Sequence, residues 1–339
     1  MLNERLTRMR NKLFDSRPCI TAERLVLETE AYQKFAGEST PIFRAKVVKY
    51  IMEHMTTLIM DDELIVGTPT NKYRGANLHP EFQSSTEFYL PELDAFPLRK
   101  TDPYDISPED RELILKTLPY WEGKSMQDMS KKALPADILE RIHDDIITVG
   151  LTNGVSGETT CDHEKLLAVG LKGYIDECRD NISSTLCSSK EDQQRVDYWN
   201  ACIIQCEGLI EYAHRMADEA ERQAAACGDP KRKQELLTIA ANCRVVPENP
   251  PQNFQQALQL VWFVHVYFHI EVCTTANGFG RFDQYMWPFY EKDVIIDKAI
   301  TKGEAMEMLE CFYLKACEVF EVRDKWYATS FAGYPMWEL

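Results

Sequence analysis

The chain has 339 residues, of which 45% are hydrophobic and 27% are charged, and its formal net charge is −16. This composition is enough for a large buried core and is typical of a globular protein rather than a disordered one. The acidic balance argues against nucleic acid or an anionic membrane as a partner, because both would repel a chain that has no basic patch.

The amino-terminus and the cysteines exclude further classes of protein. The first ten residues are charged from the outset, and no stretch of about 18 uninterrupted apolar residues occurs. The 11 cysteines are odd in number and irregularly spaced, without a Cys-x-x-Cys pair. This pattern argues against a disulfide framework or a zinc ribbon. We therefore expect a cytoplasmic protein that neither spans a membrane nor binds a metal.

The first 105 residues predict two helices, a short strand and an irregular region. Thr21-Ala-Glu-Arg24 has the pattern of a helix start, and Pro41 suits the first turn of a second helix that runs to Met55. Asp62-Glu-Leu-Ile-Val-Gly67 predicts a short strand closed by glycine. Residues 68–105 are rich in Pro, Gly and Asn with aromatic residues between them, which predicts irregular, packed connections.

From residue 107 onward the pattern is mainly helical. Ser107-Pro-Glu-Asp110 is a strong helix start, with Ser at the cap, Pro at the first position and carboxylates in the first turn. A loop rich in Gly and Thr at 150–164 precedes long amphipathic helices, one of them running from Asp192 to Cys227. Further helices are predicted from Phe254 and near 303–319. The sequence therefore predicts a mostly helical α/β protein with a few short strands.

Four groups of segments, taken in order, carry a resemblance to a known family. They are Asp62-Glu-Leu-Ile-Val-Gly67 with Arg74-Gly-Ala76; Ile106-Ser-Pro-Glu-Asp110 with Pro119-Tyr-Trp-Glu122; Pro250-Pro-Gln-Asn-Phe254 and the helix after it; and Gly280-Arg-Phe-Asp-Gln-Tyr285 with Phe331-Ala-Gly-Tyr334. In order and spacing they resemble the pyruvate formate-lyase-like glycyl radical enzymes, in the subgroup of glycerol dehydratase and choline trimethylamine-lyase. The resemblance extends over residues 1–339 as one domain and covers less than half of a typical member.

The resemblance implies a fold, a chemistry and partners. The fold is a ten-stranded α/β barrel wrapped by helices, incomplete in this chain. The implied reaction is cleavage of a C–O, C–N, C–S or C–C bond of a small polar molecule by radical hydrogen abstraction. An activating enzyme with an iron–sulfur cluster and S-adenosylmethionine installs the glycyl radical, so this chain itself is expected to bind no cofactor. A homodimer in the cytoplasm is also expected.

The two motifs that carry the radical in the resembled subgroup do not occur in the printed sequence. It contains no Gly-Cys dipeptide, and the Arg-Val pairs at Arg195-Val196 and Arg244-Val245 are not followed by the glycine of an Arg-Val-x-Gly-Tyr segment. We therefore expect a truncated chain with no catalytic residue of its own, inactive alone. The alternative is a non-catalytic helical scaffold or one subunit of a split enzyme.

Two loops are the candidate substrate contacts. Glu158 lies in Gly157-Glu-Thr-Thr-Cys-Asp-His163, where the resembled dehydratases carry His and the choline lyases carry Asp. A carboxylate there is suited to a substrate hydroxyl or cation, or to general base catalysis. Thr275 lies in the loop 272–281, where glycerol-type dehydratases carry a His-Ser pair. Since a missing hydrogen-bond partner discriminates strongly, Thr275-Ala276 argues against glycerol-type diols. The alternative to a functional role is that Glu158 is an exposed acidic residue that caps the following helix.

Three histidines are interpreted as structural residues and not as functional ones. His163 is expected to be a partly exposed loop residue. His265 and His269 are four residues apart, so a helix would place them on one face, as in metal-binding His-Glu-x-x-His segments. The Glu of that motif is absent here, so we favour a structural pair. Cys202 and Cys206, at the same spacing, are interpreted as small core residues.

Overall fold

The computed structural model describes residues 3–144, 146–147, 158–272, 276–325 and 328–329. Its helices are α1 Glu4–Asp15, α2 Glu23–Lys34, α3 Thr40–His54, α4 Leu90–Glu92, α5 Pro108–Thr117, α6 Met126–Ala133, α7 Ala136–His143, α8 His163–Ser184, α9 Lys190–Ala226, α10 Pro230–Val245, α11 Phe254–Glu271, α12 Phe282–Tyr290 and α13 Lys302–Ala316. Its strands are β1 Cys19–Thr21, β2 Gly75–Asn77, β3 Asp105–Ile106, β4 Glu158–Thr160, β5 Ala276–Gly278 and β6 Phe320–Glu321. Within the described residues, no helix is long and apolar enough to cross a bilayer.

The strands form two small parallel sheets. One has the order β3-β1-β2-β6, and the other pairs β4 with β5. In the first sheet Thr21 pairs with Asn77 and Asn77 with Glu321, so three polar residues end neighbouring strands at one edge. Carboxyl ends of parallel strands are the usual place for ligand sites in α/β proteins.

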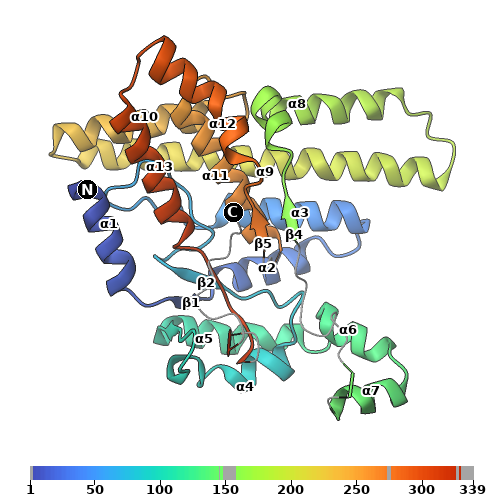
Figure 1. Cartoon of the computed structure of the whole chain (residues 1–339). Helices are drawn as coiled ribbons and strands as arrows, with labels where there is room; N and C mark the ends of the chain where they lie inside the picture. Colours follow the sequence, from blue (N-terminus) through green and yellow to red (C-terminus); the bar gives the residue numbers. More distant parts are fainter. Residues whose placement is uncertain (1–2, 145, 148–157, 273–275, 326–327, 330–339) are drawn as a thin grey trace.

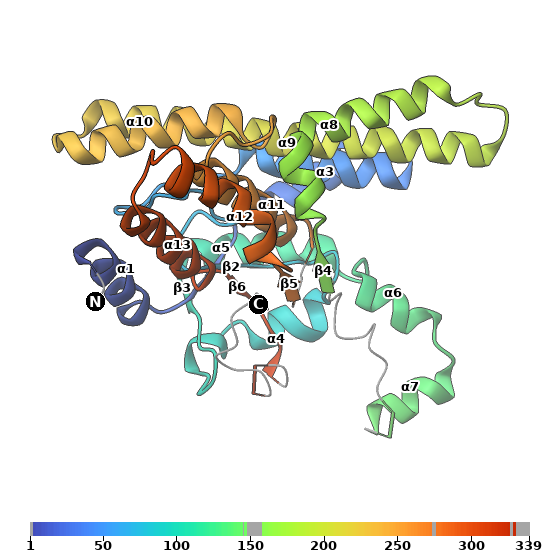
Figure 2. The same ribbon diagram turned by 45° about the horizontal axis from the view of Figure 1, so that its top comes forward.

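Long helices cover one side of these strands (Figures 1 and 2). Helices α8, α9 and α10 run across the top of both views, with α3 packed against α9, whereas α4, α6 and α7 lie on the opposite side of the strands. Helix α11 lies between the long helices and the sheets and is buried on nearly every face. Its central position makes α11 the element through which the two sheets are connected.

The predicted helix start at Ser107 is confirmed, whereas α2 follows Ala22 and has no side-chain cap from Thr21. Ser107 accepts a hydrogen bond from the backbone N–H of Asp110, and Ser189 and Thr301 form capping boxes at the starts of α9 and α13. Such caps satisfy backbone N–H groups that a helix start leaves free. The predicted helix from Asp192 to Cys227 corresponds closely to α9.

The predicted strand at 62–67 is wrong. Asp62 has a φ of 69°, and the structure shows no strand between Asp62 and Gly67. The backbone of this segment pairs with side chains of α11 instead of with a strand. Gln259 accepts from the Val66 N–H at 2.9 Å and donates to the Val66 carbonyl at 2.7 Å, and the indole of Trp262 donates to the Gly67 carbonyl at 2.9 Å. A glutamine amide here takes the place of a neighbouring strand.

Helix α8 contains a sharp kink at Gly170. Its φ of 63° and ψ of −179° are outside the helical region, and a Cβ at this position would lie 2.5 Å from the Glu248 carbonyl oxygen. The next two N–H groups, of Leu171 and Lys172, donate to the carbonyls of Pro247 and Glu248. Glycine tolerates both the conformation and the close approach, so the first part of α8 can turn down toward β4.

Candidate functional site

The pairing of β4 with β5 brings the two candidate substrate loops together. Glu158 is the register partner of Ala276, and Thr160 is the partner of Gly278. Neighbouring strands in a sheet lie about 4.8 Å apart, so the backbone of Glu158 runs beside the residue that follows Thr275. Thr275 lies outside the described residues, and only the backbone of Glu158 is described. A common cavity for the two side chains therefore stays a prediction.

Tight contacts fix the end of β4. The Asp162 carboxylate accepts a hydrogen bond from the Lys165 N–H at 3.1 Å and caps α8. The capping role considered for Glu158 is thus filled by Asp162. At the end of β5, Gly280 has a φ of 63°, and a Cβ there would lie 3.1 Å from Cγ2 of Thr160. A glycine therefore lets the two loops approach each other closely.

The prediction that His163 is partly exposed is wrong. The first residue of α8 is 6% exposed and its ring lies 5.0 Å from the ring of Tyr285 on α12. Burial lowers its pKa to about 4, with the nearby Asp162 carboxylate opposing the shift. The imidazole is therefore neutral at physiological pH. The sequence prediction failed because α12, which covers this ring, follows more than 100 residues later.

A buried ionic cluster lies where β2 and β6 end. Arg24 of α2 donates to Glu28 at 2.7 Å and to Glu81 at 2.6 Å, and its Nε donates to the carbonyl of Ile270 on α11. Arg44 lies 3.2 Å from Glu28 and 3.3 Å from Glu81. Arg24 and Glu28 are essentially inaccessible to water. The cluster therefore holds α2, α3 and α11 together around the carboxyl end of β2.

The charges of this cluster depend on one another. Burial alone would lower the pKa of Arg24, but Glu28 and Glu81 more than offset it and raise that pKa. Burial alone would raise the pKa of Glu81, whereas Arg24, His79 and Arg44 hold it well below its usual value. Burial raises the pKa of Glu28 despite the neighbouring Arg24. Paired charges of this kind are costly to break, because the remaining partner stays buried.

His265 and His269 contact each other and polar residues of both sheets. Their Nε2 atoms lie 3.2 Å apart; His265 Nδ1 faces the Asn277 amide of β5 at 3.1 Å, and His269 Nδ1 faces the Glu321 carboxylate of β6 at 3.0 Å. Burial, and then the neighbouring His269, lower the pKa of His265 well below its usual value. Within the described ranges, no group of three or more His, Cys, Asp or Glu residues is placed to hold a metal ion.

The partners of this pair could not be found from the sequence. The i, i+4 spacing of the two histidines was visible, but Glu321 is 52 residues beyond His269. Only the packing of α11 against the end of β6 brings the two groups together. The Asn277 amide gave a local signal, since it lies in the predicted substrate loop, yet its direction toward α11 depends on the strand pairing.

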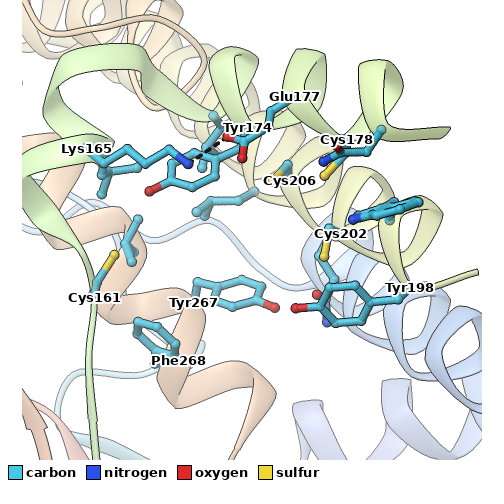
Figure 3. A pocket seen from close by; sticks show the side chains of 17 residues that line it. Cys161, Lys165, Tyr174, Glu177, Cys178, Tyr198, Cys202, Cys206, Tyr267 and Phe268 are labelled. Carbon is cyan, nitrogen blue, oxygen red and sulfur yellow. Dashed lines mark hydrogen bonds and ion pairs between the residues drawn. The ribbon is translucent and has the colours of Figure 1, made fainter. Parts of the chain in front are cut away.

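A cavity of about 420 Å³ lies between α8, α9 and α11, and Cys161, the residue after β4, is part of its lining (Figure 3). Aromatic side chains and four thiols line it, and in Figure 3 the hydroxyls of Tyr198 and Tyr267 point toward one another. Lys165 pairs with Glu177 at 2.6 Å and lies over the ring of Tyr174. Cys202 and Cys206, predicted to be core residues, are partly buried and line this cavity.

The thiols of this cavity are protonated. Burial raises the pKa of Cys161 and of Cys178 to about 11 and that of Cys206 to about 12. The pKa of Cys202 is also raised by burial. A reactive or metal-binding cysteine needs the thiolate, which a raised pKa disfavours. These cysteines therefore behave as small apolar residues.

One family model and several known proteins match nearly the whole chain. The family model described as "Pyruvate formate lyase-like" matches residues 2–339. Isethionate sulfite-lyase from Nitratidesulfovibrio vulgaris is 33% identical over 99% of this chain and 42% of its own length. Related solved structures are one on 1,2-propanediol dehydration in Roseburia inulinivorans and the glycerol-bound B12-independent glycerol dehydratase from Clostridium butyricum. They are 32% and 33% identical, with TM-scores of 0.94 and 0.93.

These matches also define how much of the fold is present. They cover 99% of this chain but only 40% and 42% of the two solved structures. The short parallel strands and dominant helices are thus those of a partial α/β barrel, which confirms the predicted fold class. The predicted resemblance is likewise confirmed over essentially the whole chain. The chain belongs to the pyruvate formate lyase-like family of glycyl radical enzymes, of which it spans the N-terminal portion.

Proposed function

We propose that this chain supplies one side of the substrate pocket of a glycyl radical lyase or dehydratase, with Glu158 and Thr275 as the contacts to a small polar substrate. The parallel pairing of β4 with β5 carries the proposal, because it brings the backbone of Glu158 beside Ala276. We expect the carboxylate and the hydroxyl within about 12 Å of each other, a span that a small polar molecule could bridge in a pocket of ordinary size.

The identities of the two residues favour a particular substrate class. A carboxylate at 158 attracts a hydroxyl or an ammonium group and repels an anion such as a sulfonate. Thr275-Ala276 supplies one hydroxyl where the resembled glycerol-type dehydratases have a His-Ser pair, which disfavours glycerol. The substrate we favour is therefore cationic or zwitterionic and carries a bond to be cleaved next to its polar group.

The radical itself would come from elsewhere in the complete enzyme. We expect a stored glycyl radical, installed by an S-adenosylmethionine-dependent activating enzyme, and a cysteine thiyl radical that abstracts hydrogen from the substrate. The chain described here would bind and orient that substrate. A homodimer is expected as well, with a mass twice the 39.2 kDa of one chain for these residues alone. Light scattering after size-exclusion chromatography measures this mass.

The proposed pocket is tested with the complete reading frame, activated anaerobically. We expect turnover of choline or trans-4-hydroxy-L-proline in preference to isethionate and glycerol. Glu158→Gln should lower kcat/KM by about 10²- to 10³-fold, because a charged contact made in the transition state is lost. Glu164→Gln, an exposed carboxylate in the first turn of α8, is the matched control. Isethionate as the best substrate, or equal activity of both variants, would contradict the proposal.

The alternative is a helical scaffold or one subunit of a split enzyme. The printed sequence favours it in one respect, since neither radical motif occurs there. The adjacent downstream DNA distinguishes the two. Segments encoding Gly-Cys-x-Glu and Arg-Val-x-Gly-Tyr in frame support a single-chain enzyme, and the same segments in a separate adjacent gene support a split one. Absence of both supports the scaffold.

A further inference from the structure

A continuous row of buried polar groups connects the two sheets through α11. Asn277 Nδ2 lies 3.1 Å from His265 Nδ1, the two histidine Nε2 atoms are 3.2 Å apart, and His269 Nδ1 lies 3.0 Å from Glu321 Oε1. None of the four residues is more than 3% exposed. The second oxygen of Glu321 lies 3.1 Å from Nε2 of His79. The row thus runs from β5 to β6 without access to water.

For a pair of neutral histidines, the carboxylate at one end sets the direction of every hydrogen bond in the row. An ionised Glu321 only accepts, so His269 must carry its proton on Nδ1. A neutral His269 then has a lone pair on Nε2, and His265 must donate to it from its own Nε2. This leaves a lone pair on His265 Nδ1, which requires a donor at residue 277. The amide nitrogen of Asn277 is that donor.

With both histidines neutral, the opposite direction is unfavourable at Glu321. If the Asn277 amide were turned, its oxygen would accept from His265 Nδ1, and His269 would donate from Nε2. The lone pair on His269 Nδ1 would then face the carboxylate at 3.0 Å. In a buried site such a contact is strongly repulsive, because neither group can turn to water. The amide orientation of Asn277 therefore follows from a charge on β6.

We propose that Glu321 acts through His269 and His265 as a positioning residue for Asn277, and that it thereby holds β5 in register beside β4. Asn277 is the partner of Thr159 in that strand pair, so each candidate substrate loop contains one of the two residues. The proposal rests on the proposed function in one respect only, namely that β5 lines the substrate pocket. The hydrogen-bond row and its direction are independent of any substrate.

The primary test is the position of the protons in the 339-residue chain. Long-range proton–nitrogen NMR on a chain labelled with ¹⁵N-histidine distinguishes the two neutral tautomers from the imidazolium, and His265→Gln and His269→Gln assign the signals. We expect His265 with its proton on Nε2 and His269 with its proton on Nδ1. A proton on Nε2 of His269, with or without one on Nδ1, would overturn the proposal.

Two variants at Glu321 test the positioning role. Glu321→Leu removes the acceptor, so both histidines should show mixed tautomers, and the amides of Asn277 and Gly278 should exchange with solvent at least about tenfold faster. Glu321→Gln retains a carbonyl acceptor of the same shape and should restore the parental tautomers. Equal exchange rates in the parent and the leucine variant would contradict the role.

A variant at the other end provides an independent result should the leucine variant not fold. Asn277→Asp places a carboxylate, which cannot donate, opposite His265 Nδ1. Both ends of the row then require a donor, so the histidine pair must bind one additional proton. We expect three protonated ring nitrogens at neutral pH in place of two. A pair that keeps two protons in this variant would refute the proposed direction, whatever the activity of the complete enzyme.

Discussion

The buried ring of His163 makes stability depend on pH. Its pKa is lowered from the ordinary 6.5 to about 4 by burial, so between these values the unfolded chain binds a proton that the folded chain does not. Stability is therefore lost as pH falls from 6.5 toward 4, by up to about 3 kcal/mol from this residue. In His163→Leu, urea unfolding followed across this range should depend less steeply on pH, whereas His54→Leu, at an exposed position, should resemble the parent. Superimposable parent and His163→Leu profiles would exclude this source of acid sensitivity.

A second prediction at this scale concerns Arg24. Arg24→Met removes the more buried of the two arginines that pair with Glu28 and Glu81, and we expect the free energy of unfolding to fall by about 3–5 kcal/mol. Arg222→Met, which breaks an exposed pair with Glu219 on α9, should leave it unchanged within error. Denaturant titrations of the three proteins measure this difference. Similar losses in both variants would mean that the buried cluster contributes no more to the free energy of unfolding than an exposed ion pair does.

Among the elements, α11 provides a side chain that bonds the backbone of Val66 where a neighbouring strand would otherwise do so. Gln259 is 2% exposed and satisfies both backbone groups of Val66. Gln259→Leu should lower the free energy of unfolding by about 2–5 kcal/mol, because a buried donor and a buried acceptor both lose their partner. Gln234→Leu, on the exposed face of α10, is the control. A loss no larger than that of the control would show that water or a rearranged backbone satisfies Val66.

The same segment shows what the sequence could and could not predict. Helix ends have local sequence signals. The caps at Ser107 and Ser189 and the end of α9 at Ala226 are therefore predictable from a few neighbouring residues. The strands are two or three residues long and pair across 50 residues or more, as Cys19 does with Gly75. Apolar alternation at 62–67 was visible, but its partner is a helix far along the chain. Of the candidate site, the two loops were predicted from a family resemblance, whereas His163 burial and the Glu321 row depend on packing alone.

In the whole molecule, we expect substrate binding and radical chemistry to be carried by different parts of the complete protein. The chain spans 42% of the length of the isethionate sulfite-lyase that it matches. In the printed sequence no cysteine follows a glycine, and no glycine lies in an Arg-Val-x-Gly-Tyr segment. Our proposal therefore gives the substrate contacts to Glu158 and Thr275 and the radical to residues outside this chain. In this proposal the paired strands β4 and β5 are the part of the pocket that this chain contributes.

Electron paramagnetic resonance tests this division most directly. The 339-residue chain is mixed with an activating enzyme and S-adenosylmethionine under strict anaerobiosis, beside the complete reading frame treated in the same way. We predict no glycyl radical signal and no lyase activity from the chain alone, because the setting that stores the radical and the cysteine that uses it are not in its sequence. The complete protein should give the doublet of a glycyl radical. A glycyl doublet from the 339 residues alone would contradict the account.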